Sequence, residues 1–124
     1  MSISHASQRG FTMIELLVVM AIILILTQVA VPKYAEYRKR GFDLRAASDL
    51  RNVAMAEEAY FLDNEGYLSC ENNACQALPG ISALSAGTQL SMTSSELSFT
   101  GNASHPKGTG RVFTWDSERG GMLE

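Results

Sequence analysis

The chain has 124 residues, which is enough for one domain. Its formal net charge is −3, since 13 Asp and Glu residues outnumber 10 Lys and Arg residues. This mildly acidic balance carries no bulk basic signal, so no specific nucleic acid partner is predicted. Contact with DNA would need a local basic patch.

The first predicted element is an apolar segment, residues 11–31, that starts directly after Gly10. It holds one ionisable side chain, Glu15. As a helix it would be roughly 31 Å long, close to the hydrocarbon thickness of a bilayer, and we therefore expect one membrane span. A secretory signal is cut after its apolar region, whereas a cut before this segment would leave the span on the mature protein.

Glu15 is the most informative residue of this segment. A charged side chain costs about 2.5–3.5 kcal/mol at the centre of a membrane helix, and somewhat less near an end, so such residues are usually functional. A cut between Gly10 and Phe11 would create an amine one helical turn from Glu15. In a filament, the amine of one subunit would then neutralise the carboxylate of its neighbour.

The run Gly10-Phe11-Thr12-Met13-Ile14-Glu15, with a short polar leader before it, the apolar segment after it and then Pro32, resembles a type IV pilin precursor. The resemblance implies a peptidase that cuts after Gly10 and methylates the amine of Phe11. It divides the chain into a leader (1–10), a transmembrane and filament-core helix (11–31) and a globular domain (32–124) that includes the second half of the helix. Removing the leader takes away Arg9 and changes the formal charge to −4.

The resemblance also implies a topology and a path. The precursor would cross the inner membrane once with its N-terminus in the cytoplasm, and the subunit would later become part of an extracellular filament on the cell surface. The positive-inside rule alone would favour the opposite orientation, because four cations follow the span: Lys33, Arg38, Lys39 and Arg40. We follow the motif, which is more specific than a charge count.

A helix is expected to continue to about Leu62, because residues 34–62 contain no proline, one glycine and many good helix formers. Pro32 removes a backbone hydrogen bond and predicts a kink. The resemblance implies that residues 25–31 unwind in a filament, and a plain kink in an intact helix is the alternative. The second half of the helix has an apolar stripe, interrupted by Glu57, with Asp49 on the polar side: Ala46, Ala47, Leu50, Val53, Ala54 and Phe61.

Beyond this helix the sequence predicts a small sheet. Residues 63–66 predict a helix-ending turn with Gly66 in the left-handed conformation. Alternation predicts strands at 88–92, 96–100 and 111–116, with a loop at 101–110 and a short strand after a turn at 117–121. The expected fold class is α+β. A long N-terminal helix, half transmembrane and half amphipathic, packs on an antiparallel sheet of three to four strands, as in the pilin fold.

The two cysteines, Cys70 and Cys75, enclose a loop of four residues. Outside the cytoplasm a pair this close favours a local disulfide over free thiols. Closing so short a loop would stabilise the fold by roughly 2 kcal/mol. A haem attachment site would need a His after Cys75, and a zinc site would need further ligands.

No catalytic, cofactor or metal site is predicted. His5 falls in the leader and His105 precedes Pro106 in a loop, and neither joins a Ser and an acid in a recognisable catalytic pattern. Residues 63–66 lack the spacing of a calcium loop. The sequon at Asn102 leaves glycosylation open. The chain is expected to be a substrate of an enzyme and not itself an enzyme.

The leading interpretation is a structural subunit of a type IV pilus, for adhesion, motility or related functions. Implied partners are further copies of the chain, minor pilins, the prepilin peptidase and methyltransferase, an assembly platform protein, an ATPase and an outer-membrane secretin.

Three alternatives stay open. The first is a type II secretion pseudopilin, which a calcium cluster near the C-terminus would favour. The second is a membrane-anchored monomer, which gives no reason for Glu15. The third is an electron-conducting pilus subunit, suggested by aromatic residues on or just beyond the helix: Phe11, Tyr34, Tyr37, Phe42, Phe61 and Tyr67.

Overall fold

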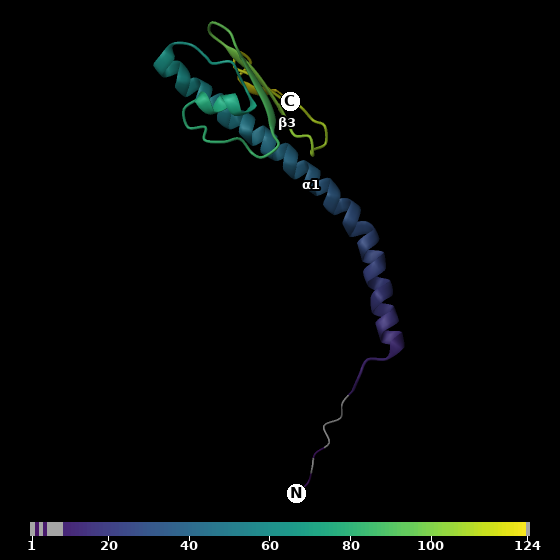
Figure 1. The fold of residues 1–124 in the computed structure, drawn as a ribbon. Coiled ribbons are helices and arrows are strands. Elements are labelled where there is room, and N and C mark those ends of the chain that lie inside the picture. The colour runs from purple at the N-terminus through teal and green to yellow at the C-terminus, as the bar shows by residue number, and fades with distance from the viewer. Residues whose placement is uncertain (1, 3, 5–8, 124) are drawn as a thin grey trace. The chain divides into compact units, whose positions relative to one another are not determined.

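The computed structural model describes Ser2, Ser4 and residues 9–123 (Figure 1). The remaining residues of the expected leader, His5 among them, lie outside the described residues. The elements in chain order are the helix α1 (Met13–Asn64), β1 (Cys70–Glu71), the 3₁₀ helix η1 (Asn72–Ala77), β2 (Gln89–Ser94), β3 (Phe99–Ser104), β4 (Phe113–Asp116) and β5 (Gly121–Leu123). The chain forms two compact units, residues 1–35 and 36–124, and α1 contributes to both.

The first unit contains the apolar part of α1. The exposed fraction of the large apolar side chains in this part of α1 runs from 51% at Val19 to 83% at Met13. The most apolar 18-residue window has a mean hydropathy of 2.7, and none of it is buried. By length and composition, α1 is the one helix among the described residues that could cross a membrane. The helix continues without interruption through Pro32, so residues 25–31 are helical, and the kink stays a prediction.

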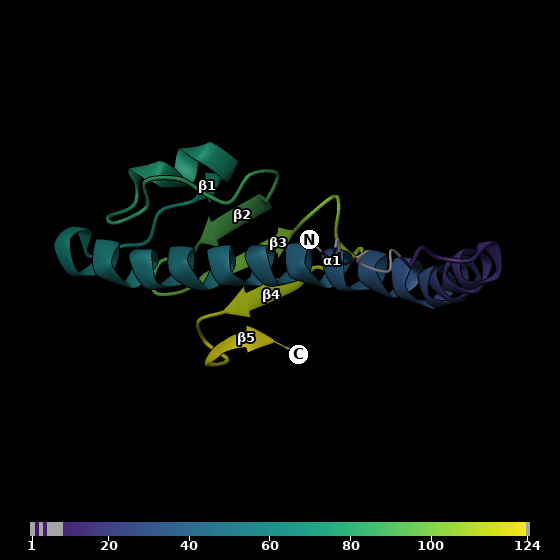
Figure 2. The same cartoon turned by 90° about the horizontal axis from the view of Figure 1, so that it is seen from below.

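The second unit is a helix packed on a sheet. The sheet has five strands in the order β1-β2-β3-β4-β5, and every neighbouring pair is antiparallel (Figure 2). Alternation along β2 and β3 buries Leu90, Met92, Phe99 and Ala103. These side chains form one core with the apolar stripe of α1, which confirms the α+β fold.

The stripe of α1 is largely as predicted. Ala46, Leu50, Val53 and Ala54 are 0–1% exposed, whereas Ala47 and Phe61 are half-buried. Gly101 in β3 permits the close approach of helix and sheet. A Cβ atom there would lie 3.0 Å from Leu50 Cδ1 and would collide with Met92 Sδ.

Several strand boundaries differ from the prediction. The sheet has five strands and not the predicted three to four. The prediction missed β1, because a strand of two residues is too short to show alternation. The strand predicted at 96–100 corresponds to β3, but its bounds are wrong: β3 runs from Phe99 to Ser104, and Leu97 is 81% exposed. Residues 101–104 are strand and not loop: their backbone pairs with β2, and Gly101 and Ala103 are buried.

The end of α1 also differs from the prediction. The left-handed residue is Glu65, with φ of 54°, and Gly66 is not left-handed. The helix runs two residues beyond Leu62, and the backbone nitrogen of Glu65 donates to Phe61 O at 2.8 Å. The left-handed residue that ends the helix is therefore one position before the predicted Gly66.

Candidate processing and assembly site

The start of α1 is closed by two reciprocal hydrogen bonds. Thr12 N donates to Glu15 Oε2 at 3.1 Å, and Glu15 N donates to Thr12 Oγ1 at 3.2 Å. This arrangement is a capping box, in which two side chains satisfy backbone groups that the first helical turn leaves unpaired. The carboxylate also lies at the positive end of the helix dipole. The signal for it in the sequence is Thr-x-x-Glu ahead of an apolar run, which the expectations above do not include.

The bond between Gly10 and Phe11 precedes this cap. Neither residue belongs to a helix or strand, and Phe11 is 91% exposed. A Cβ atom at Gly10 would meet nothing within 4 Å. The chain's own packing therefore gives no reason for a glycine at this position, and any requirement for it must come from another molecule.

The predicted site residues fall into separate groups. Gly10, Phe11 and Glu15 lie within six residues of one another around the start of α1. Pro32 is 17 residues beyond Glu15, roughly 26 Å along a helix. The cysteines belong to the second unit.

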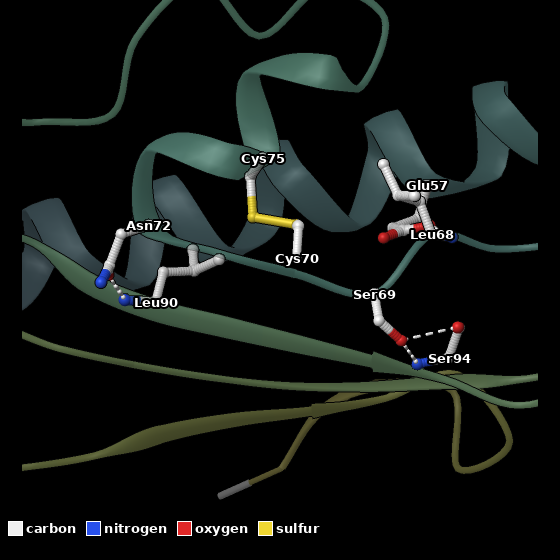
Figure 3. Close-up of a disulfide and its surroundings, with 8 residues drawn as sticks. All are labelled: Glu57, Leu68, Ser69, Cys70, Asn72, Cys75, Leu90 and Ser94. Carbon is white, nitrogen blue, oxygen red and sulfur yellow. Dashed lines mark hydrogen bonds between the residues drawn. A yellow bond between two sulfur atoms is a disulfide. The ribbon is translucent and has the colours of Figure 1, made fainter.

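The predicted disulfide between Cys70 and Cys75 is present, with the two Cα atoms 5.1 Å apart. It joins β1 to η1 and is buried, Cys75 completely (Figure 3). Hydrogen bonds on either side attach the same segment to β2. Asn72 Oδ1 accepts from Leu90 N at 2.9 Å, and Ser69 Oγ accepts from Ser94 N at 2.9 Å.

Three acidic residues of α1 are buried and connect the helix to three different loops. Asp43 accepts from Thr109 N at 3.1 Å, Asp49 accepts from Ser85 N at 3.1 Å, and Glu57 accepts from Leu68 N at 2.8 Å. The helical pattern predicts Asp49 on the polar side and makes Glu57 an exception in the apolar stripe, whereas both are buried. The helical pattern alone shows a carboxylate but not the loop that binds it.

Glu57 is the most deeply buried of the three, with no exposed surface. Burial raises the pKa of its carboxyl group above 4.5, the hydrogen bond from Leu68 opposes this rise, and the charge of Glu58 adds to it. Its Oε1 atom has no hydrogen-bond partner among the described residues. This carboxyl group is therefore less acidic than an exposed glutamate.

The second unit contains two separate groups of packed aromatic rings. Phe61, Tyr67 and Phe99 pack with ring centroids 4.7–4.8 Å apart, and Phe42 stacks on His105 at 4.5 Å. Phe42 and Phe61 are 19 residues apart on α1, roughly 28 Å. Tyr34 and Tyr37 are mostly exposed. The described rings therefore do not form one continuous stack within a subunit.

Among the described residues, no group of three or more His, Cys, Asp or Glu side chains could hold a metal ion. The residues present thus offer no support for the calcium cluster that would favour a pseudopilin.

Comparison with known proteins agrees with this geometry. Residues 5–27 match the family described as "Prokaryotic N-terminal methylation motif". The type IV wide pilus major component PilA4 of Thermus thermophilus is 36% identical over 82% of this chain and 76% of its own length. The type IV major fimbrial protein FimA of Dichelobacter nodosus is 32% identical over 87% and 81%. A type II secretion system core protein G of Pectobacterium carotovorum is 36% identical, but over 52% and 41%.

A methylation motif, an exposed apolar helix behind it and an antiparallel sheet packed on the second half of that helix define a pilin-like protein. The similarity to pilus and fimbrial components over four fifths of the chain is more specific. The chain belongs to the type IV pilin family.

Proposed function

We propose that this chain is a structural subunit of a type IV pilus. A peptidase cuts it between Gly10 and Phe11, and the new amine of Phe11 is methylated. The subunit then polymerises through the apolar half of α1. The observation that carries this proposal is the first unit itself: a helix whose apolar side chains are uncovered by the chain, directly behind an accessible Gly10–Phe11 bond.

Two environments can cover this helix in turn. Before assembly the inner membrane holds it, with the N-terminus in the cytoplasm. In the filament, the helices of neighbouring subunits replace the lipid. Because lipid already satisfies an apolar helix, association is not driven by the hydrophobic effect alone. This favours an assembly machine with a platform protein, an ATPase and a secretin, together with minor pilins, and a filament outside the cell.

Glu15 has two possible roles in this scheme, capping its own helix and pairing with a neighbour's amine. We propose that pairing is the role that assembly requires. After cleavage the amine lies four residues from the carboxylate, and in a filament core an uncompensated buried charge typically costs 3–5 kcal/mol. The capping box, by contrast, needs only a side-chain oxygen at this position.

Three substitutions separate these roles. Glu15→Gln keeps the cap acceptor and removes the charge, Glu15→Val removes both, and Thr12→Val removes the reciprocal cap while it keeps the charge. We expect both Glu15 variants to enter the membrane but to yield few filaments, and Thr12→Val to assemble. The measurement is the subunit content of sheared filaments and of membranes. Normal filament numbers in Glu15→Gln would show that the charge pair is not required.

The pseudopilin alternative rests on the shorter similarity to core protein G. Long sheared surface filaments composed of this subunit would favour the pilus, whereas a subunit confined to the cell envelope would favour the pseudopilin.

A further inference from the structure

Charge is unevenly distributed along the second unit. From Asn52 to Pro106 the chain has no Lys or Arg but six acidic residues. The preceding part of α1 and the loop after β3 hold most of the cations. One end of the α1 segment is therefore basic and the other acidic.

The basic end is organised around a single ring. Three cationic side chains lie near the Phe42 ring. The distance to the ring centroid is 5.8 Å from Arg38 Cζ, 5.1 Å from Arg45 Cζ and 5.9 Å from Lys107 Nζ. Arg38, Phe42 and Arg45 follow one face of α1, because residues at i, i+4 and i+7 are neighbours on a helix. Lys107 comes from the loop after β3. We call Arg38, Arg45 and Lys107 the basic cluster.

No acidic residue near the basic cluster forms an ion pair with it among the described residues. The His105 ring stacks on Phe42, its Nδ1 accepts from Lys107 N at 3.1 Å, and its Nε2 lies 3.0 Å from Ala86 O. Asp43 accepts hydrogen bonds from the backbone nitrogen and the hydroxyl of Thr109. Glu36 forms an ion pair with Arg40, with 2.6 Å between Glu36 Oε1 and Arg40 Nη2. The three cations make no ion pair among the described residues. Three like charges around one ring repel one another, so the cluster suits an anionic partner.

The acidic end of the same unit is the complement. Asp63 and Glu65, at the end of α1, are exposed and make no ion pair among the described residues. With Glu58 they are the acidic end, and Glu58 accepts a hydrogen bond from Tyr67 OH at 3.3 Å. Phe42 and Asp63 are 21 residues apart, which is roughly 32 Å along the helix.

We propose that the basic cluster of one subunit binds the acidic end of another copy. This partner assignment rests on the proposed function. The two surfaces are different and lie far apart on one rigid helix, so a parallel copy displaced by about 32 Å brings them together. Contacts between two different surfaces of identical subunits are head-to-tail and can repeat without closing, which is the condition for an open filament.

A charge-swap experiment in cells tests this contact. Arg38→Glu with Arg45→Glu reverses the basic cluster, and Asp63→Lys with Glu65→Lys reverses the acidic end. Each pair brings like charges together and should lower the filament yield by about tenfold or more. The combined four-residue variant restores opposite charges and should recover most of the yield. Arg51→Glu is the matched control, an exposed cation of α1 outside the cluster, and should assemble normally.

Subunit content in membranes and in sheared filaments is measured together for every variant. Assembly of both reversed pairs at the wild-type level would overturn the contact while the pilus function stands. Reversed pairs that fail without rescue by the swap would also overturn it and would point to a different anion, such as lipid phosphate. If the wild-type chain itself forms no filaments, the proposed function fails first.

Discussion

Single carboxylates have different roles in the two units. Glu15 is exposed at the start of α1, where it caps the helix, while Asp43, Asp49 and Glu57 are buried against loops. Each buried carboxylate accepts a backbone N–H that would otherwise lack a partner, and an unpaired buried group is expensive. The three buried carboxylates of α1 therefore attach loops of the second unit to the helix.

Glu57 predicts a pH dependence of stability. Its pKa is raised above 4.5 in the folded protein, so the folded state holds the proton more tightly than the unfolded chain. The protonated Glu57 therefore contributes to the free energy of unfolding. This contribution is fully present below the ordinary carboxyl pKa and is lost as the pH rises through the raised pKa. Glu57→Gln keeps an oxygen for Leu68 N and has no charge, so it should remove this loss.

The predicted pH dependence is measured by thermal unfolding of residues 36–124, followed by circular dichroism. The pH series extends from below the ordinary carboxyl pKa to above the raised pKa of Glu57. Glu58→Gln, an exposed neighbour with the same charge change, should keep most of the wild-type slope. Parallel pH profiles for wild type and Glu57→Gln would refute it.

At the scale of elements, the disulfide fixes the segment between α1 and β2. Replacing Cys70 and Cys75 with Ser should lower the free energy of unfolding by roughly 2 kcal/mol, because the unfolded chain loses a cross-link. Chemical denaturation of the 36–124 fragment measures this. Membrane insertion of the full chain should be unchanged, since the bond lies in the second unit. Two free thiols in non-reduced filaments would remove the basis of the prediction.

The contact between α1 and β3 gives a second test at this scale. Gly101→Ala places a methyl group against Leu50 and Met92 and should destabilise the unit by about 1–3 kcal/mol. Gly41→Ala on α1 meets nothing within 4 Å and should stabilise it by about 0.4–1 kcal/mol. Equal unfolding midpoints for the two variants would contradict the close approach at Gly101.

Prediction from sequence succeeded where one signal extends over many residues. The helix was expected from residue 11 to about 62 and runs from Met13 to Asn64, because a continuous apolar segment is followed by a long stretch of good helix formers without proline. β1 was missed because two residues show no period. The partner of Asp49 is Ser85, 36 residues away, and no local pattern identifies it. At the candidate site, the capping box was readable, whereas the role of Glu15 in a filament depends on molecules outside this chain.

At the scale of the whole molecule, the two units differ in what completes them. The second unit has its own core and disulfide, whereas the first has no covering within the described chain. Maturation is therefore expected to act on the first unit without disturbing the second.

Gly10→Val tests this separation. The added side chain meets nothing in the chain, so the fold should be unchanged, but it should obstruct the peptidase and leave a precursor in the membrane. Intact-mass analysis should find wild-type filament subunits that start at Phe11 and carry one methyl group. Gly41→Ala, far from the cut, should be processed normally. Assembled subunits that retain residues 1–10 would contradict the proposal.

The two edges of the sheet have a consequence for crowding. β1 at one edge has two residues and β5 at the other has three, so neither offers a long row of free backbone groups. Long exposed edges invite strand pairing between molecules and lead to aggregation. Subunits held side by side in a membrane or filament meet at very high local concentration. With both edges this short, such encounters cannot propagate as a shared sheet, and ordered association is left to the helices.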